Sequence, residues 1–184
     1  MLRRKPVRAL VTYFSKTGNT KKIAEHIYAI LKNKNHQVDM CSYDKINEMD
    51  LYGYDLYFVG SPCHSNDIVK PIKNVINRLT LVKKAKIFGF VTHSTETDGE
   101  YYQKWAYNCE KYYLELSNSG KINLKGYYHC KAKPNFLIKL FIKKMVVTDN
   151  KAWEEYRKDI MDHPNQDDFN KLEAIVEEVL TKWQ

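Results

Sequence analysis

The chain has few of the residues that mark disulfide-stapled, metal-binding or membrane-spanning proteins. Its 184 residues include four cysteines, spaced far apart and without a CxxC pair: Cys41, Cys63, Cys109 and Cys130. This spacing argues against a zinc site and a disulfide framework, and it favours a reduced, cytoplasmic setting. No uncharged apolar run reaches the roughly 18 residues of a spanning helix. The basic N-terminus, MLRRKP, lacks the apolar core of a signal peptide.

Glycine and proline are also scarce, with 7 and 5 residues, while hydrophobic residues make up 43% of the chain. This composition is typical of a globular protein, and we expect residues 1–184 to form one domain with a substantial core. The formal net charge of +8 leaves several partners open, namely nucleic acid, an anionic membrane surface or an acidic protein. A lysine-rich composition without any functional meaning is the fourth alternative.

Strand and helix patterns alternate along the chain. Mostly apolar runs predict five strands, at residues 7–14, 36–42, 54–60, 85–92 and 121–130. Helical spacing predicts helices from after Thr20 to about 33, from 71 to 79, from 102 to 116, and from 169 to Trp183, with Asn165 and Asp168 as cap residues of the last. This alternation implies right-handed crossovers and a parallel sheet covered on both faces. Residues 131–164 do not fit it and form an insertion before the last helix.

Three polar loops follow the first, third and fourth strands: SKTGNT (15–20), SPCHSNDI (61–68) and HSTETDG (93–99). In an open parallel sheet, ligands bind beyond the carboxyl ends of the strands, where the strand order reverses. The first loop joins a strand to a helix N-terminus and is rich in hydroxyls, which favours a phosphate. Gly18 allows the backbone to approach a ligand closely. The other two loops are suited to flanking a flat heterocycle.

The motif SKTGNT, between its strand and its helix, resembles the FMN phosphate loop of flavodoxins, whose usual form is [ST]-x-T-G-N-T. It differs from GxxxxGK[ST] and from GxGxxG. The resemblance covers nearly the whole chain, including the last helix after an HPN start. It implies an α/β, flavodoxin-like, doubly wound fold: a five-stranded parallel sheet in the order 2-1-3-4-5, with an insertion between strand 5 and the last helix.

The resemblance also implies a set of FMN-binding residues. The phosphate would contact Ser15, Lys16, Thr17, Gly18, Asn19 and Thr20. The second loop, with Ser61, Pro62, Cys63, His64 and Ser65, would border the ring, and the third, with Thr92, His93, Ser94, Thr95, Asp98 and Gly99, would cover its other side. The protein would position the flavin, which carries the electron chemistry. No catalytic side chain and no metal ligand are predicted.

Aromatic and thiol groups near the ring are few. The second loop has only His64 in place of a stacking Trp or Tyr, so Tyr101 or Tyr102 is the candidate for stacking from the other side. We interpret Cys63 as a small loop residue without thiol chemistry, because no second cysteine is close to it in the sequence.

The insertion contains a dense apolar stretch, KAKPNFLIKLFIKKMVV, with five lysines and no acidic residue between Lys131 and Thr148. Four interpretations stay open: a helix packed on the domain with solvated lysines, a dimer contact, a lid over the flavin, or a basic amphipathic helix on an anionic membrane. The FxIKLxxK pattern resembles the insertion of flavodoxin-like, quinone-dependent protoporphyrinogen dehydrogenases. That likeness would link the segment to a lipid-soluble electron acceptor.

The first functional hypothesis is an FMN protein that carries electrons between redox partners. The alternative is a flavin-dependent reductase or dehydrogenase that acts on a quinone or porphyrin-type substrate at a membrane surface, and the third is a binding module that has lost the flavin. The expected partners are a redox protein or a quinone-type acceptor, not nucleic acid. Peripheral membrane contact through residues 134–147 and a homodimer are left open.

Overall fold

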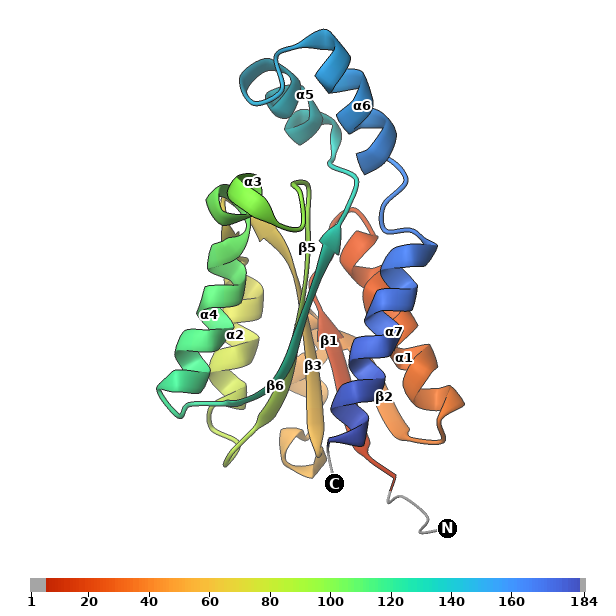
Figure 1. Ribbon diagram of the computed structural model, residues 1–184. Coiled ribbons are helices and arrows are strands. Elements are labelled where there is room, and N and C mark those ends of the chain that lie inside the picture. The colour runs from red at the N-terminus through yellow and green to blue at the C-terminus, as the bar shows by residue number, and fades with distance from the viewer. Residues whose placement is uncertain (1–5, 183–184) are drawn as a thin grey trace.

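The computed structural model describes residues 6–182, and its centre is a parallel sheet (Figure 1). The strands are β1 (Arg8–Tyr13), β2 (Gln37–Ser42), β3 (Leu56–His64), β5 (Lys86–His93) and β6 (Asn123–Lys131), in the order β2-β1-β3-β5-β6. The predicted order of five parallel strands is therefore confirmed. The structure does not describe Trp183, the predicted end of the last helix, or residues 1–5, which include most of the basic N-terminal segment MLRRKP.

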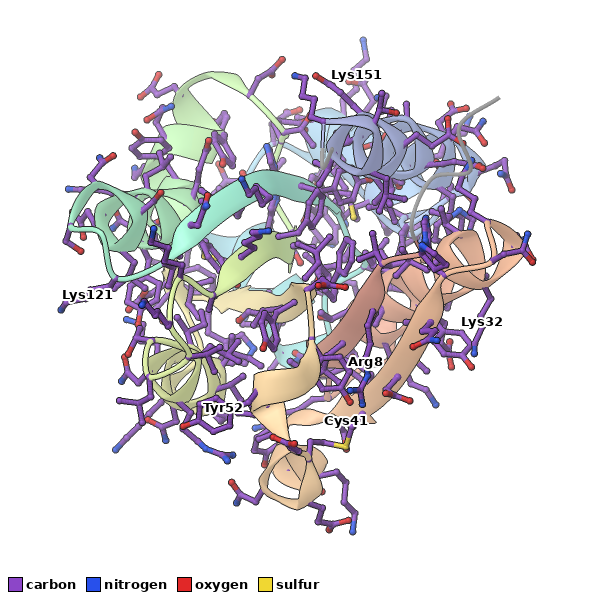
Figure 2. All side chains as sticks on the ribbon, turned by 90° about the horizontal axis from the view of Figure 1, so that it is seen from below. Arg8, Lys32, Cys41, Tyr52, Lys121 and Lys151 are labelled. Carbon is purple, nitrogen blue, oxygen red and sulfur yellow. The ribbon has the colours of Figure 1, made fainter. Side chains whose placement is uncertain are left out.

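Helices cover both faces of the sheet (Figure 1). On one face lie α1 (Asn19–Asn33) and α7 (Gln166–Thr181), and on the other α2 (Lys70–Leu79) and α4 (Tyr107–Asn118). Successive strand residues point to opposite faces: in β1, Ala9 and Val11 belong to the first core and Leu10 to the second. Two short 3-10 helices, η1 (Tyr43–Glu48) and η2 (Leu51–Gly53), precede β3. Figure 2 views the sheet from the end opposite the three loops.

Residues 61–64 were predicted to belong to the second loop, but this prediction is wrong, because they are part of a strand. Strand β3 continues to His64 and turns back into a two-residue strand, β4 (Asp67–Ile68), which pairs with it antiparallel. Ser65 and Asn66 form the turn with φ of 52° and 59°. Positive φ at both central residues is typical of the tight turn that matches the twist of a hairpin. The hairpin thus gives residues 61–65 a defined backbone at the rim.

The predicted helix from 102 to 116 is in fact two helices. Helix α3 (Gly99–Trp105) ends at Ala106, whose φ of −142° is not helical, and α4 begins at Tyr107. Asn66 of the hairpin bridges the break, since its side-chain amide donates to the carbonyl of Lys104 (3.0 Å) and accepts from the backbone N–H of Asn108 (3.1 Å). The break leaves backbone groups that need partners, and Asn66 supplies them from a distant part of the chain.

The insertion folds into two helices, α5 (Phe136–Met145) and α6 (Asn150–Ile160), which project beyond the carboxyl ends of the strands (Figure 1). The side chains of Asn135 and Asp149 cap their first turns. The predicted caps of the last helix are confirmed, because Asn165 and Asp168 form a reciprocal capping box at the start of α7.

Candidate functional site

The first loop connects β1 to α1 and ends in an open helix N-terminus. The N–H of Phe14 donates to the carbonyl of Gly60 (3.0 Å), which fixes the start of the loop to β3. Gly18, the N-cap residue, has a φ of 86°, and within the described structure no side chain caps the helix. The first turn, NTKK, contains no acidic residue. The N–H of Lys22 donates to the Gly18 carbonyl (3.0 Å), while the N–H groups before it at the helix N-terminus have no intrahelical acceptor and favour an anion.

Side chains of the first loop add polar groups around this end. Among the described residues the Ser15 hydroxyl is buried and has no hydrogen-bond partner. The Thr17 oxygen accepts from the Asn19 amide (3.2 Å), which leaves its own hydrogen free to donate. The buried hydroxyls of Thr20 and Thr92 bond each other at 2.8 Å, tying the first loop to the third. A buried, unpartnered donor beside uncapped N–H groups fits a phosphate.

The second loop faces the first across an open cavity of about 550 Å³, whose lining includes Phe14, Lys16, His64 and Ser65. Ser61 is fully buried, and its hydroxyl accepts from the N–H of Val69 at 3.2 Å, so its role is to hold the hairpin. Partial burial and the charge of Lys16 lower the pKa of His64, which keeps the imidazole neutral at neutral pH. A second open depression lies on α6, away from these loops.

The third loop follows β5. The aromatic side chains next to it, His93, His129 and Tyr102, contact one another instead of pointing to solvent. The His93 ring is buried and bonds the His129 ring at 2.9 Å. Burial, with the charge of His129 second, lowers the pKa of His93 to about 3, so the ring is uncharged. His129 in turn stacks on Tyr102, with ring centroids 4.5 Å apart. The prediction that Tyr102 is available to stack on a ligand is therefore wrong, while Tyr101 is exposed.

The remaining third-loop residues differ in exposure. Ser94 and Thr95 are half-buried, whereas Asp98 and Gly99, at the start of α3, are exposed. The structure thus brings the hydroxyls of the first and third loops together and leaves Asp98 and Gly99 at the outer rim.

The insertion supplies groups to the site that the sequence did not single out. The Asn19 amide donates to the carbonyl of Lys133 (3.0 Å), and the Ser94 hydroxyl donates to the carbonyl of Ala132 (3.0 Å). The Tyr156 hydroxyl of α6 donates to the Ser94 carbonyl at 2.9 Å. The one available signal was position, since residues 131–133 directly follow a predicted strand and so lie at the same rim. The insertion braces the first and third loops.

Lys131 joins the insertion to the third loop through charge. Its ammonium pairs with Glu96 at 2.5 Å and with Asp159 of α6 at 2.7 Å. Burial alone would lower the pKa of Lys131, but Asp159 and Glu96 together raise it, so the lysine stays charged.

These features define a class: a doubly wound α/β protein with an anion-binding loop where its strand order reverses, between β1 and β3. The family model described as "Flavodoxin domain" matches residues 10–177, and the chain belongs to this family. No curated protein sequence matches it. Family membership supports FMN as the cofactor and electron transfer as the general activity, and the uncapped N-terminus of α1 fits a phosphate.

Solved structures share the fold at low sequence identity. A short-chain flavodoxin associated with a bacterial microcompartment has a TM-score of 0.65 at 13% identity, covering 97% of this chain and 99% of that one. An archaeal flavodoxin has a TM-score of 0.62 at 16% identity, with 96% and 98% covered. A flavodoxin from Streptococcus pneumoniae has a TM-score of 0.62 at 14% identity, with 95% and 98% covered.

Two structural findings concern membrane-spanning helices and metal sites. Within residues 6–182, no helix is long and apolar enough to cross a membrane. In the same range, no three His, Cys, Asp or Glu side chains are grouped so that they could hold a metal ion. The likeness of the insertion to protoporphyrinogen dehydrogenases stays a prediction.

Proposed function

We propose that the protein holds FMN, with its phosphate in the loop Ser15–Thr20, and carries electrons between redox partners. The observation that carries this proposal is the uncapped N-terminus of α1 beside the buried, unpartnered Ser15 hydroxyl. When bound, FMN supplies the electron chemistry. The protein supplemented with FMN is expected to retain visible flavin absorbance through gel filtration and to exchange electrons with a redox protein. Loss of all flavin in that step would contradict the proposal.

The residues have distinct roles in this proposal. Backbone N–H groups of Lys16 to Thr20 and the hydroxyls of Ser15 and Thr17 donate to the phosphate. Asn19 positions the loop, because its amide hydrogens are used by Thr17 and Lys133. Residues 61–65 and 92–95, with Asp98 and Gly99, flank the ring, and His64 is the ring-shaped side chain of the second loop.

Substitutions in the first loop separate side-chain from backbone contributions. Thr17→Val removes a donor to the phosphate and should weaken FMN binding by about 1–3 kcal/mol, as expected for a lost hydrogen bond to a charged group. Asn19→Ala removes the hydrogen bonds to Thr17 and Lys133 that position the loop, so it should also weaken FMN binding. Lys16→Ala is the control and should cost little, because the scheme assigns only the backbone N–H of Lys16 to the phosphate and its side chain is exposed. Fluorescence titration of FMN measures all three. Equal affinities in the three variants would count against the phosphate site.

A second function is favoured by one specific observation, the apolar surface of α5. Six of its apolar side chains are exposed: Phe136, Leu137, Ile138, Leu140, Phe141 and Met145. Lysines lie among them, and no acidic residue occurs between Lys131 and Thr148. A basic, apolar helix of this kind suits an anionic membrane surface. The protein is then a cytoplasmic enzyme that binds the membrane peripherally and passes electrons to a quinone, or takes them from a porphyrin-type substrate.

Deletion of residues 134–147 distinguishes the two functions. The deletion removes α5 but keeps Ala132, Lys133 and Tyr156, which brace the loops. For the membrane enzyme, quinone-coupled turnover on vesicles should be lost while FMN binding persists. Undiminished turnover in the deletion variant would rule out a role for α5. A homodimer through the same apolar residues would instead appear as a concentration-dependent mass in sedimentation without lipid.

A further inference from the structure

Two cysteines that are distant in the sequence meet beside the second loop. Cys63 lies near the end of β3, and Cys109 lies in the first turn of α4, which the helix break at Ala106 creates. Both side chains belong to the same buried cluster, and the two thiols are close enough to shift each other's pKa. The interpretation that Cys63 has no second cysteine nearby is therefore wrong, because the structure brings Cys109 to it.

Several contacts hold the two cysteines in this arrangement. The Cys63 thiol also lies 3.3 Å from the carbonyl of Trp105, the last residue of α3. Asn66, three residues after Cys63, bonds both Lys104 and the N–H of Asn108, next to Cys109. The hairpin is thus attached to the α3–α4 junction on both sides of the helix break at Ala106.

The two thiols differ in exposure and acidity. Cys63 is half-buried, while Cys109 is fully buried at 0% exposure. The neighbouring Cys109 thiol lowers the pKa of Cys63, and backbone N–H groups of Asp67 and Asn66 lower it further, against the opposing effect of burial. The same pairing, with burial, raises the pKa of Cys109. Since the thiolate is the nucleophile in disulfide exchange, Cys63 is the residue that attacks and Cys109 the residue that resolves.

We propose that Cys63 and Cys109 are a dithiol site that low-molecular-weight disulfides oxidise reversibly to an intramolecular disulfide. The Cys63 thiolate attacks one sulfur of the small disulfide, which forms a mixed disulfide and releases one thiol. The Cys109 sulfur, on losing its proton, displaces the second thiol from Cys63. Two protein thiols are oxidised to one disulfide, and one small disulfide is reduced to two thiols. The exchange requires no flavin.

A disulfide between Cys63 and Cys109 would restrict the backbone at one edge of the candidate site. It would cross-link the end of β3 to α4 and so fix the hairpin formed by residues 63–68. Because this hairpin borders the open cavity next to the first loop, the oxidation state of the pair would set the mobility of one wall of that cavity. The proposal stands independently of FMN, since it depends only on the two thiols and their neighbours.

The test treats the reduced, full-length protein with oxidised glutathione and maps its peptides without reduction. The expected result is a linked pair of peptides containing Cys63 and Cys109, restored to free thiols by dithiothreitol. Hydrogen exchange at residues 63–68 should slow in the oxidised form. In Cys109→Ser and Cys109→Ala, one glutathione should remain attached to Cys63.

Two further variants complete the design. Cys63→Ser should leave Cys109 unmodified, because that thiol is buried. Cys41→Ser is the matched control and should not change the linkage, since Cys41 lies in β2, the edge strand of the sheet, which β1 separates from the β3 strand of Cys63. A stable glutathione adduct on Cys63 in the natural protein, or linkage seen only after denaturation, would overturn the proposal.

Discussion

Replacing Phe136 and Leu137 together with glutamate is expected to abolish binding to vesicles of anionic lipid. The two side chains are 71% and 72% exposed, so the native fold loses little packing when they are changed. Burying one such side chain in an apolar phase is worth roughly 1.5–3 kcal/mol. The double substitution removes the burial free energy of both side chains and places two carboxylates near anionic headgroups. Partition into vesicles should therefore fall by about 100-fold or more.

The matched control places the same charge change elsewhere. Tyr52 and Leu81 are each 74% exposed, and Figure 2 shows Tyr52 at the end of the sheet opposite the insertion. Tyr52→Glu with Leu81→Glu should leave vesicle binding intact, because neither residue belongs to α5. Co-sedimentation with anionic and with neutral vesicles measures the effect, and the binding of the natural protein should weaken as salt increases. If the natural protein does not co-sediment with anionic vesicles, the proposed membrane function is wrong.

Thr17→Glu is expected to eliminate FMN binding without destabilising the protein. Thr17 is exposed, and it lies beside the uncapped N-terminus of α1. A carboxylate there would occupy the position that favours an anion and would repel the phosphate, at about 4 kcal/mol for unit charges about 4 Å apart near a protein surface. FMN affinity should therefore fall by about 100-fold or more. The same carboxylate interacts favourably with the helix dipole, by about 0.3–1 kcal/mol, so the thermal midpoint of the flavin-free protein should stay equal or rise.

Thr17→Gln is the control for this change, because it alters the size of the side chain without adding charge. It should lose only the contribution of the hydroxyl and bind FMN more tightly than Thr17→Glu. Isothermal titration with FMN and thermal unfolding without it are the two measurements. Similar FMN affinities for the two variants would contradict an anionic ligand at this loop.

The strand order and the loop before α1 were predictable from the sequence because their signals are local. Apolar runs and helical spacing specify each element, and the handedness of crossovers then limits how parallel strands can be arranged. The loop is equally local, since SKTGNT follows its strand and precedes its helix without a gap. The cap residues Asn165 and Asp168 were found for the same reason, because a capping box spans a single turn.

The sequence by itself therefore determined the family, the sheet and the end of α1 where an anion is favoured. Only the tertiary structure decided which groups meet at the rim. Asn66 bridges the helix break at Ala106, Cys63 lies beside Cys109, and the loops are braced by Lys133 and Tyr156. Each of these contacts joins segments that are far apart in the chain, and no local periodicity encodes them. They exist because the hairpin and α4 pack on one sheet, with the insertion at its carboxyl end, which brings their side chains within bonding distance.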